Sequence, residues 1–122
     1  MEQAERDLEV ARGNAQLGYH EWACFAAQQA AEKALKAVLY SRLRESRTHV
    51  LKLLVRDIDD SAPKRVIDGA RVLDAYYIAT RYANGHDSGA PFSYYDARES
   101  EQAIEYAGVL IEFARSRMAG PR

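Results

Sequence analysis

The sequence predicts an all-α fold, and three observations lead to this prediction. Apolar residues recur at every third or fourth position in successive segments, which is the spacing of one helix face. No stretch alternates between apolar and polar residues for long enough to form a strand. The 122 residues are 48% hydrophobic and 29% charged, which suits one globular domain with one core. We therefore expect residues 1–122 to form a single up-and-down bundle of four main helices plus one short helix.

The first predicted helix spans about residues 2–17 and ends at Gly18, because glycine commonly stops a helix. It carries one narrow apolar stripe among charged residues, so we expect it on the outside of the bundle. The stripe consists of Ala4, Leu8, Ala11 and Ala15.

The second predicted helix, about residues 20–43, is long, rich in alanine and free of proline and glycine. Its apolar side chains cover about half of the circumference, so the helix must touch more than one neighbour. Trp22, Phe25 and Tyr40 fall on or beside the opposite, polar arc, and this mixture suggests a contact surface. A solvated helix face is the alternative interpretation. The polar residues of the arc are Gln28, Gln29, Glu32, Lys33 and Lys36.

Two helices follow in the middle of the chain. A short one is expected over about residues 49–57, with Thr48 as its cap. The turn at 59–63 ends it and starts a longer helix, which has Pro63 in its tolerant first turn and runs to about Tyr82. The core stripe of that longer helix consists of Val66, Ala70, Leu73 and Tyr77.

The last helix comes after the one long loop of the chain, which starts at Asn84-Gly85 and is polar with aromatic residues at its end. Asp96 and Glu99 form a capping box at the start of this helix, which runs to about Met118. Its apolar stripe consists of Ala103, Ile104, Ala107, Leu110, Ile111, Ala114 and Met118.

Several kinds of chemistry are absent from the sequence. The common phosphate-binding loops, the H-E-x-x-H zinc motif and the Glu-x-x-His pairs of di-iron bundles do not occur. The three histidines, His20, His49 and His86, fall in separate elements without the spacing of metal ligands. The sequence therefore predicts no metal and no cofactor. Cys24 falls on the apolar half of its helix, where an inert buried thiol is more common than a nucleophile.

The charge and hydropathy of the chain limit which binding partners and which cellular compartment fit the sequence. The chain has 17 Lys and Arg against 18 Asp and Glu, so any nucleic-acid binding needs a local basic patch. No run of about 18 apolar residues is present, so no membrane span is predicted. One cysteine excludes an intramolecular disulfide, and the acidic, polar N-terminus is unlike a signal peptide. We therefore expect a cytoplasmic protein.

The residues left to carry chemistry lie at the end of the longer middle helix, which runs to about Tyr82, and in the loop after it. Arg81 falls beside the buried stripe, where its charge needs a partner. That partner is Asp74 or a C-terminal helix carbonyl on one interpretation and a phosphate group on the other. On the second, His86 acts as general acid or base and Arg81 stabilises the charge on phosphorus, which suffices without metal for attack by an RNA 2′-hydroxyl. The two side chains converge only if the helix ends between them or if a second subunit shares the groove.

The sequence resembles the HEPN domain family in three places that together cover nearly the whole chain. Residues 25–37, Phe-Ala-Ala-Gln-Gln-Ala-Ala-Glu-Lys-Ala-Leu-Lys-Ala, are similar to the second-helix signature of that family. Thr48-His49 and the leucines after it resemble its third helix. Residues 74–82 and the Gly89–Tyr94 part of the loop resemble its fourth helix and loop. The resemblance implies a helical, nucleotide-binding bundle that forms a homodimer.

The resemblance also implies partners and an activity. Members are often encoded beside a minimal nucleotidyltransferase, and many such pairs behave as toxin and antitoxin. In nuclease members an R-x4–6-H motif is catalytic, with two copies meeting in the dimer cleft; Arg81 and His86 match this motif. Tyr82 stands where nuclease members often have a small polar residue, and Ser88 where some members have a tyrosine that the partner adenylylates.

Two functions follow from these patterns. One is a nucleotide- or RNA-binding module that acts with a minimal nucleotidyltransferase in a toxin–antitoxin-like pair. The alternative is a metal-independent endoribonuclease with Arg81 and His86 as catalytic residues. The predicted nucleotide- or RNA-binding residues are Gln29, Glu32, Lys33, Lys36, Asp74, Tyr77 and Tyr82.

Overall fold

The computed structural model describes residues 1–81 and 95–118, with only the backbone described for residues 78–81. Every regular element in these ranges is a helix, which confirms the predicted all-α class. The helices are α1 (Glu2–Gln16), α2 (His20–Ser41), α3 (Leu51–Ile58), α4 (Lys64–Arg81) and α5 (Ala97–Arg117). Within the described ranges, none of them is long and apolar enough to span a membrane.

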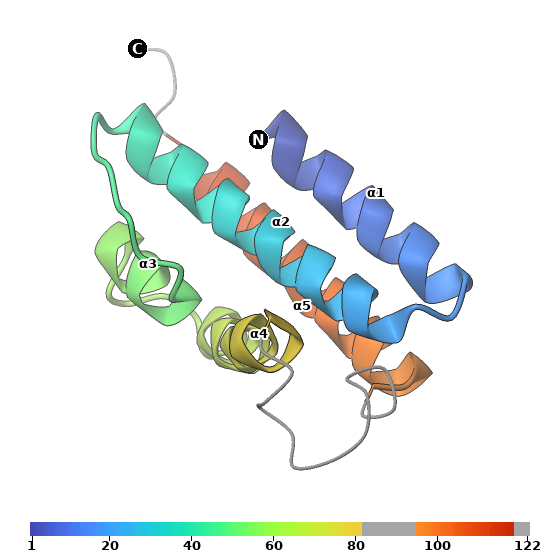
Figure 1. Ribbon diagram of the computed structural model, residues 1–122. Helices are drawn as coiled ribbons and strands as arrows, with labels where there is room; N and C mark the ends of the chain where they lie inside the picture. Colours follow the sequence, from blue (N-terminus) through green and yellow to red (C-terminus); the bar gives the residue numbers. More distant parts are fainter. Residues whose placement is uncertain (82–94, 119–122) are drawn as a thin grey trace.

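Helix α2 is the centre of the bundle, as its wide apolar arc predicts. It packs against all four other helices. Figure 1 shows α1 along one side of α2, α3 and α4 on the other side, and α5 behind it. The small side chains of α2 let these neighbours approach closely. The fully buried hydrophobic residues of α2 are Ala23, Cys24, Ala27, Ala30, Ala31, Ala34, Leu35 and Val38.

Helices α1 and α2 end in the same hydrogen-bonded motif, one with glycine and one without. After α1, Gly18 has φ +85°, and the backbone N–H groups of Gly18 and Tyr19 donate to Ala15 and Asn14. After α2, the corresponding left-handed residue is Leu43, with φ 59°. Helix α2 therefore ends at Ser41, two residues before the predicted end, because Leu43 already has a non-helical backbone.

The core stripe of α4 differs from the prediction at its last position. Val66, Ala70 and Leu73 are buried as expected, but Tyr76 is buried in place of Tyr77. Tyr76 packs against Tyr95, which precedes α5, with ring centroids 6.0 Å apart. Tyr77, the next residue, is half-buried and lies about 100° further round the helix. The ring of Tyr77 lies against His49, in the segment that precedes α3.

Helix α5 starts as predicted. Asp96 accepts a hydrogen bond from the backbone N–H of Glu99 at 2.9 Å, which is the first half of the expected capping box. Its predicted stripe is buried from Ala103 to Ala114 at the positions that face α2 and α4, while Ile104 is half-buried and Met118 lies beyond the helix.

Candidate functional site

The face of α2 that the sequence predicts to be polar is partly buried. Gln28 is 0% exposed and Glu32 is 6% exposed, although both lie on that arc. Gln29 and Lys36 are half-buried, and Lys33 is exposed. A simple solvated face is therefore the wrong interpretation for Gln28 and Glu32. Buried polar groups need partners, and the partners of these two define the candidate site.

Glu32 is the centre of a hydrogen-bond network. Its carboxylate accepts from His49 Nδ1 at 2.8 Å, from Lys36 Nζ at 3.0 Å and from Gln28 Nε2 at 3.3 Å. Burial alone would raise the pKa of Glu32, but the hydrogen bonds from Lys36, His49 and Gln28 outweigh it and hold this pKa below its ordinary value. The site therefore contains a carboxylate that stays ionised at neutral pH.

His49 connects this network to α4. A carboxylate can only accept, so Nδ1 of His49 carries a proton and Nε2 is left for another partner. The ring of His49 stacks on the ring of Tyr77, with centroids 5.1 Å apart and planes 12° apart. The side chain of His49 is 52% exposed. The structure thus presents an oriented, half-exposed imidazole. Sequence analysis assigned His49 no functional role.

Asp74 has a structural task in this arrangement. Its two carboxylate oxygens accept from the backbone N–H groups of Leu51 at 2.7 Å and Lys52 at 3.2 Å. Asp74 therefore caps α3 from the neighbouring helix, while Thr48, the predicted cap, accepts instead from the N–H of Val50 at 3.1 Å. Burial raises the pKa of Asp74, and these two hydrogen bonds oppose that rise.

The remaining predicted residues of α2 do not all join this site. Lys33 pairs with Asp7 of α1 at 2.6 Å, on the other side of α2 from His49. Gln29 donates to Gln28 Oε1 at 2.7 Å and so supports the network from outside. Of the predicted binding residues, the structure brings together Glu32, Lys36, Asp74 and Tyr77, and it separates Lys33 from them.

The predicted catalytic pair lies at the edge of what the structure describes. Arg81 is a backbone position in α4, four residues and therefore about one turn beyond Tyr77. Tyr82 and His86 lie outside the described residues. Tyr77 is therefore the member of this site that lies nearest to Arg81 along α4.

Two other kinds of site find no support in the described part of the chain. No group of three or more potential ligands there could hold a metal ion. Cys24 is fully buried, and burial raises its pKa to about 12, so the thiolate needed for nucleophilic chemistry is strongly disfavoured.

Comparison with known proteins identifies the family to which the chain is similar. The HEPN domain model matches residues 1–117. The crystal structure of TT1696 from Thermus thermophilus is 39% identical, with a TM-score of 0.91, and the alignment covers 96% of this chain and 94% of that one. ST0689, an archaeal HEPN homologue, is 36% identical with a TM-score of 0.83 over 97% of this chain and 93% of that one.

A third structure is more distant. It is a HEPN domain protein from Thermotoga maritima, 30% identical with a TM-score of 0.75 over 95% of this chain and 93% of that one. No curated protein matches the chain.

Proposed function

The chain belongs to the HEPN domain family, and from this premise we propose that it is an RNA- or nucleotide-binding module that acts with a minimal nucleotidyltransferase in a toxin–antitoxin-like pair. The observation that carries the binding role is the arrangement of His49. Glu32 holds this half-exposed imidazole by Nδ1, and Tyr77 stacks on its face.

This arrangement suits recognition of a nucleotide for two reasons. An imidazole with a free nitrogen hydrogen-bonds to a phosphate oxygen or a base edge, and its orientation is set before the ligand arrives. Arg81, about one turn further along α4, supplies the permanent positive charge that a phosphate requires. The site thus combines the imidazole of His49 with the guanidinium of Arg81 on α4.

Fluorescence anisotropy with a labelled single-stranded RNA tests the binding role. The wild type is expected to bind, and His49→Ala and Arg81→Ala are each expected to weaken binding about tenfold or more. Lys64→Ala is the matched control, because it removes a positive charge that is 88% exposed at the opposite end of α4. Equal affinity in the wild type and both site variants would reject this site.

The partner and the homodimer need their own measurements. Light scattering of the purified chain is expected to give the mass of two subunits, and a mass of one subunit would reject the dimer. Mixing with a minimal nucleotidyltransferase encoded beside this chain's gene is expected to give a stable complex in the same experiment. Failure to associate would leave RNA binding in place and remove the toxin–antitoxin role.

Metal-independent RNA cleavage is the second candidate, favoured by the spacing of Arg81 and His86 in the sequence. Purified protein is incubated with a structured RNA pool in EDTA, beside Arg81→Ala and His86→Ala. Cleavage that leaves 2′,3′-cyclic phosphate ends and is lost in both variants would establish the nuclease. Cleavage equal in all three proteins would indicate a contaminant, and RNA that is bound but intact would leave the binding module.

A further inference from the structure

One face of α2 is exposed or half-exposed along the whole length of the helix. The other four helices pack against α2, but in Figure 1 none of the described helices lies in front of it, on the side toward the viewer. At 100° per residue, the positions of α2 that are not buried between Trp22 and Tyr40 form one straight strip, here named the outer strip. It consists of Trp22, Phe25, Ala26, Gln29, Lys33, Lys36, Ala37 and Tyr40.

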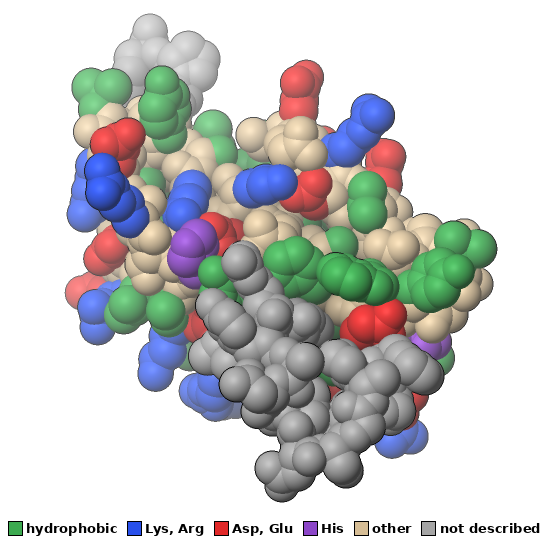
Figure 2. All heavy atoms as spheres, in the orientation of Figure 1, with side chains coloured by type: hydrophobic (Ala, Val, Ile, Leu, Met, Phe, Trp, Pro, Cys, Tyr) green, Lys and Arg blue, Asp and Glu red, His purple; other side chains and the backbone are tan. Residues whose placement is uncertain are grey.

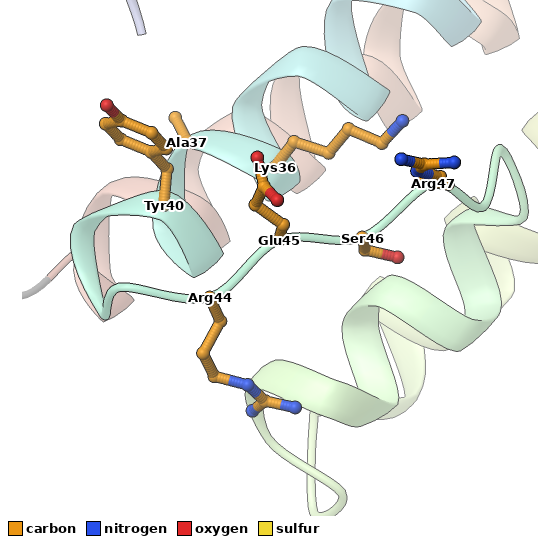
Figure 3. Close-up of a pocket in the computed structure, with 7 residues that line it drawn as sticks. All are labelled: Lys36, Ala37, Tyr40, Arg44, Glu45, Ser46 and Arg47. Carbon is orange, nitrogen blue, oxygen red and sulfur yellow. The ribbon is translucent and has the colours of Figure 1, made fainter.

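The outer strip carries a large aromatic ring at each end. Trp22 is 57% exposed and Tyr40 is 74% exposed. Figure 2 shows hydrophobic side chains gathered over the first half of α2 and the turn that precedes it. Figure 3 shows the Tyr40 ring projecting outward from the last turns of α2, with Ala37 beside it. Because aromatic residues are enriched where two proteins meet, the two rings indicate a protein surface as the occupant of the strip.

Each ring borders a hollow in the surface. One hollow of about 540 Å³ lies between α1 and the first half of α2, and its lining includes Val10, Trp22 and Ala26. The other, of about 610 Å³, lies beside the last turns of α2, and its lining includes Ala37 and Tyr40. The strip therefore has a projecting ring and a depression at both of its ends.

The strip matches itself when it is turned end for end. Trp22 and Tyr40 lie nine positions before and after position 31, and both fall on the midline of the strip. Ala26 and Ala37 lie five positions before and six after, on the same edge of the strip. A second copy of α2 that runs antiparallel to the first therefore brings Trp22 against Tyr40 of the partner subunit, and Ala26 against Ala37 of the partner subunit. Such self-complementarity is what a two-fold dimer requires.

The polar residues of the strip fit the same arrangement. Gln29 and Lys33 lie two positions before and after position 31, so Lys33 meets Gln29 of the partner subunit. Nε2 of Gln29 donates within its own chain, which leaves Oε1 to accept from that ammonium group. The lysines of the strip are paired with carboxylates of their own chain, Lys33 with Asp7 at 2.6 Å and Lys36 with Glu32 at 3.0 Å. The two copies therefore bring no unpaired like charges together.

The size of the strip is sufficient for a specific interface. Helix α2 runs about 27 Å from Trp22 to Tyr40, and a helix with its side chains is about 10–12 Å wide. With the bordering hollows the contact is about 20 Å wide, so roughly 500 Å² is buried on each subunit and roughly 1,000 Å² in total. This total is at the lower limit for a specific interface, so we expect a dimer that dissociates on dilution.

We propose that the outer strip is the interface between two copies of this chain, with α2 antiparallel to α2 of the partner subunit about a two-fold axis at the level of Ala31. The inference rests on the homodimer of the proposed function, to which it gives a surface and a geometry. It also extends the site of Glu32 and His49. Phe25 of the partner subunit lies at the level of Lys36, against the aliphatic stem of that side chain, so each subunit forms part of the wall of the other's site.

Cysteine cross-linking tests the geometry with two small substitutions. Ala26→Cys/Ala37→Cys is expected to form a covalent dimer under mild oxidation, because the two cysteines face each other across the interface. Within one chain they are about 16 Å apart, which is too far for a disulfide. The single variants Ala26→Cys and Ala37→Cys are the matched controls. Each is expected to cross-link at least about ten times more slowly, because its two copies lie about 15–18 Å apart. Cys24 does not compete, since it is fully buried.

The mass of the full chain, measured by light scattering, tests the aromatic residues. Trp22→Glu/Tyr40→Glu is expected to raise the dissociation constant of the dimer at least about 100-fold and to give the mass of one subunit. Met118→Glu is the control, because it also places a charge at an exposed apolar position, but after α5, which lies behind α2 in Figure 1. It is expected to keep the mass of two subunits. Circular dichroism reports whether each variant folds, and cross-linking decides alone where one does not.

The outcomes separate this inference from the proposed function. If the wild type and a folded Trp22→Glu/Tyr40→Glu both have the mass of two subunits, the interface lies elsewhere, and the inference is overturned while the homodimer stands. Cross-linking of a single variant as fast as Ala26→Cys/Ala37→Cys overturns the antiparallel pairing. If the wild type has the mass of one subunit at about 0.1 mM, the inference and the homodimer both fail. RNA binding is then decided separately, by the anisotropy of labelled RNA with the same sample.

Discussion

Glu32 and His49 lie 2.8 Å apart, carboxylate oxygen to Nδ1, and this contact ties the buried face of α2 to the segment that precedes α3. The pair is asymmetric in burial. The side chain of Glu32 is 8% exposed, and that of His49 is 52% exposed. Glu32 is therefore the fixed member, and His49 is the member that we propose contacts a ligand.

The first prediction concerns the pH dependence that Glu32 creates. Because its folded pKa lies below the unfolded value of 4.5, the carboxylate stabilises the fold above that value, and this contribution is lost as the pH falls through the folded pKa. Glu32→Gln is expected to lower the free energy of unfolding by about 1.5–3 kcal/mol at neutral pH. In urea titrations, the difference between the wild type and the variant is expected to shrink below about pH 5.

Glu101→Gln serves as the control for this experiment, since Glu101 is an exposed carboxylate on α5. It is expected to change stability by less than about 0.5 kcal/mol at any pH. A difference between the wild type and Glu32→Gln that stays constant down to about pH 3 would contradict the role given to the Glu32 charge.

The second prediction concerns the cap of α3. Asp74→Ala leaves the N–H groups of Leu51 and Lys52 without their acceptors and is expected to cost about 1–2 kcal/mol. Asp74→Asn keeps one acceptor oxygen and is expected to lose less. Thermal unfolding followed by circular dichroism measures both, with Asp60→Ala at an exposed turn as the control. A larger loss in Asp74→Asn than in Asp74→Ala would show that the carboxylate does not act as a cap.

Most of the fold was predictable because each helix carries its own signal. The apolar stripe of α1, the wide arc of α2 and the capping residue Asp96 are local patterns, and the structure confirms them, except that Ala15 at the end of the α1 stripe is only half-buried. The cap of α3 was not predictable in this way. Asp74 is 23 positions from Leu51, and only tertiary packing brings them together.

The candidate site was predictable in its residue types more than in its geometry. The polar arc of α2 indicated Glu32 and Lys36, but sequence periodicity does not reveal that Glu32 is buried under a neighbouring segment. His49 received no functional role from the sequence, because its contact with Tyr77 depends on which face of α4 carries that tyrosine. The signal in the sequence was a glutamate one turn before a lysine on the polar arc of the second helix.

The third prediction uses two glycines in helix interiors. A Cβ on Gly69 of α4 would lie 2.8 Å from Cδ1 of Tyr106 on α5, whereas a Cβ on Gly108 would meet nothing within 4 Å. Gly69→Ala is therefore expected to destabilise the protein by about 1 kcal/mol, despite the better helix propensity of alanine. Gly108→Ala is expected to stabilise it by about 0.5–1 kcal/mol. Chemical denaturation compares the two, and stabilisation by both would show that α4 and α5 have room to separate.

The fourth prediction concerns the thiol of Cys24. Burial raises its pKa to about 12, so very little thiolate is present at neutral or mildly alkaline pH. Ellman's reagent is expected to react with the folded protein only as fast as the protein unfolds, and at once in denaturant. Fast reaction of the native protein would show that Cys24 is exposed by a local opening of α2.

The last prediction follows from the contrast between Gly18 and Leu43. Both occupy the left-handed position after a helix, and after α2 the N–H groups of Leu43 and Arg44 donate to Tyr40 and Leu39 in the same pattern as after α1. A side chain at such a φ is strained, and Leu43 gains nothing from packing because it is 96% exposed. Leu43→Gly is therefore expected to raise the free energy of unfolding by about 1 kcal/mol. Leu17→Gly is the control: Leu17 is also exposed but has a right-handed backbone with φ −84°, so glycine there is expected to be destabilising. A stabilising effect at both positions would trace the gain to removal of an exposed leucine and not to relief of backbone strain.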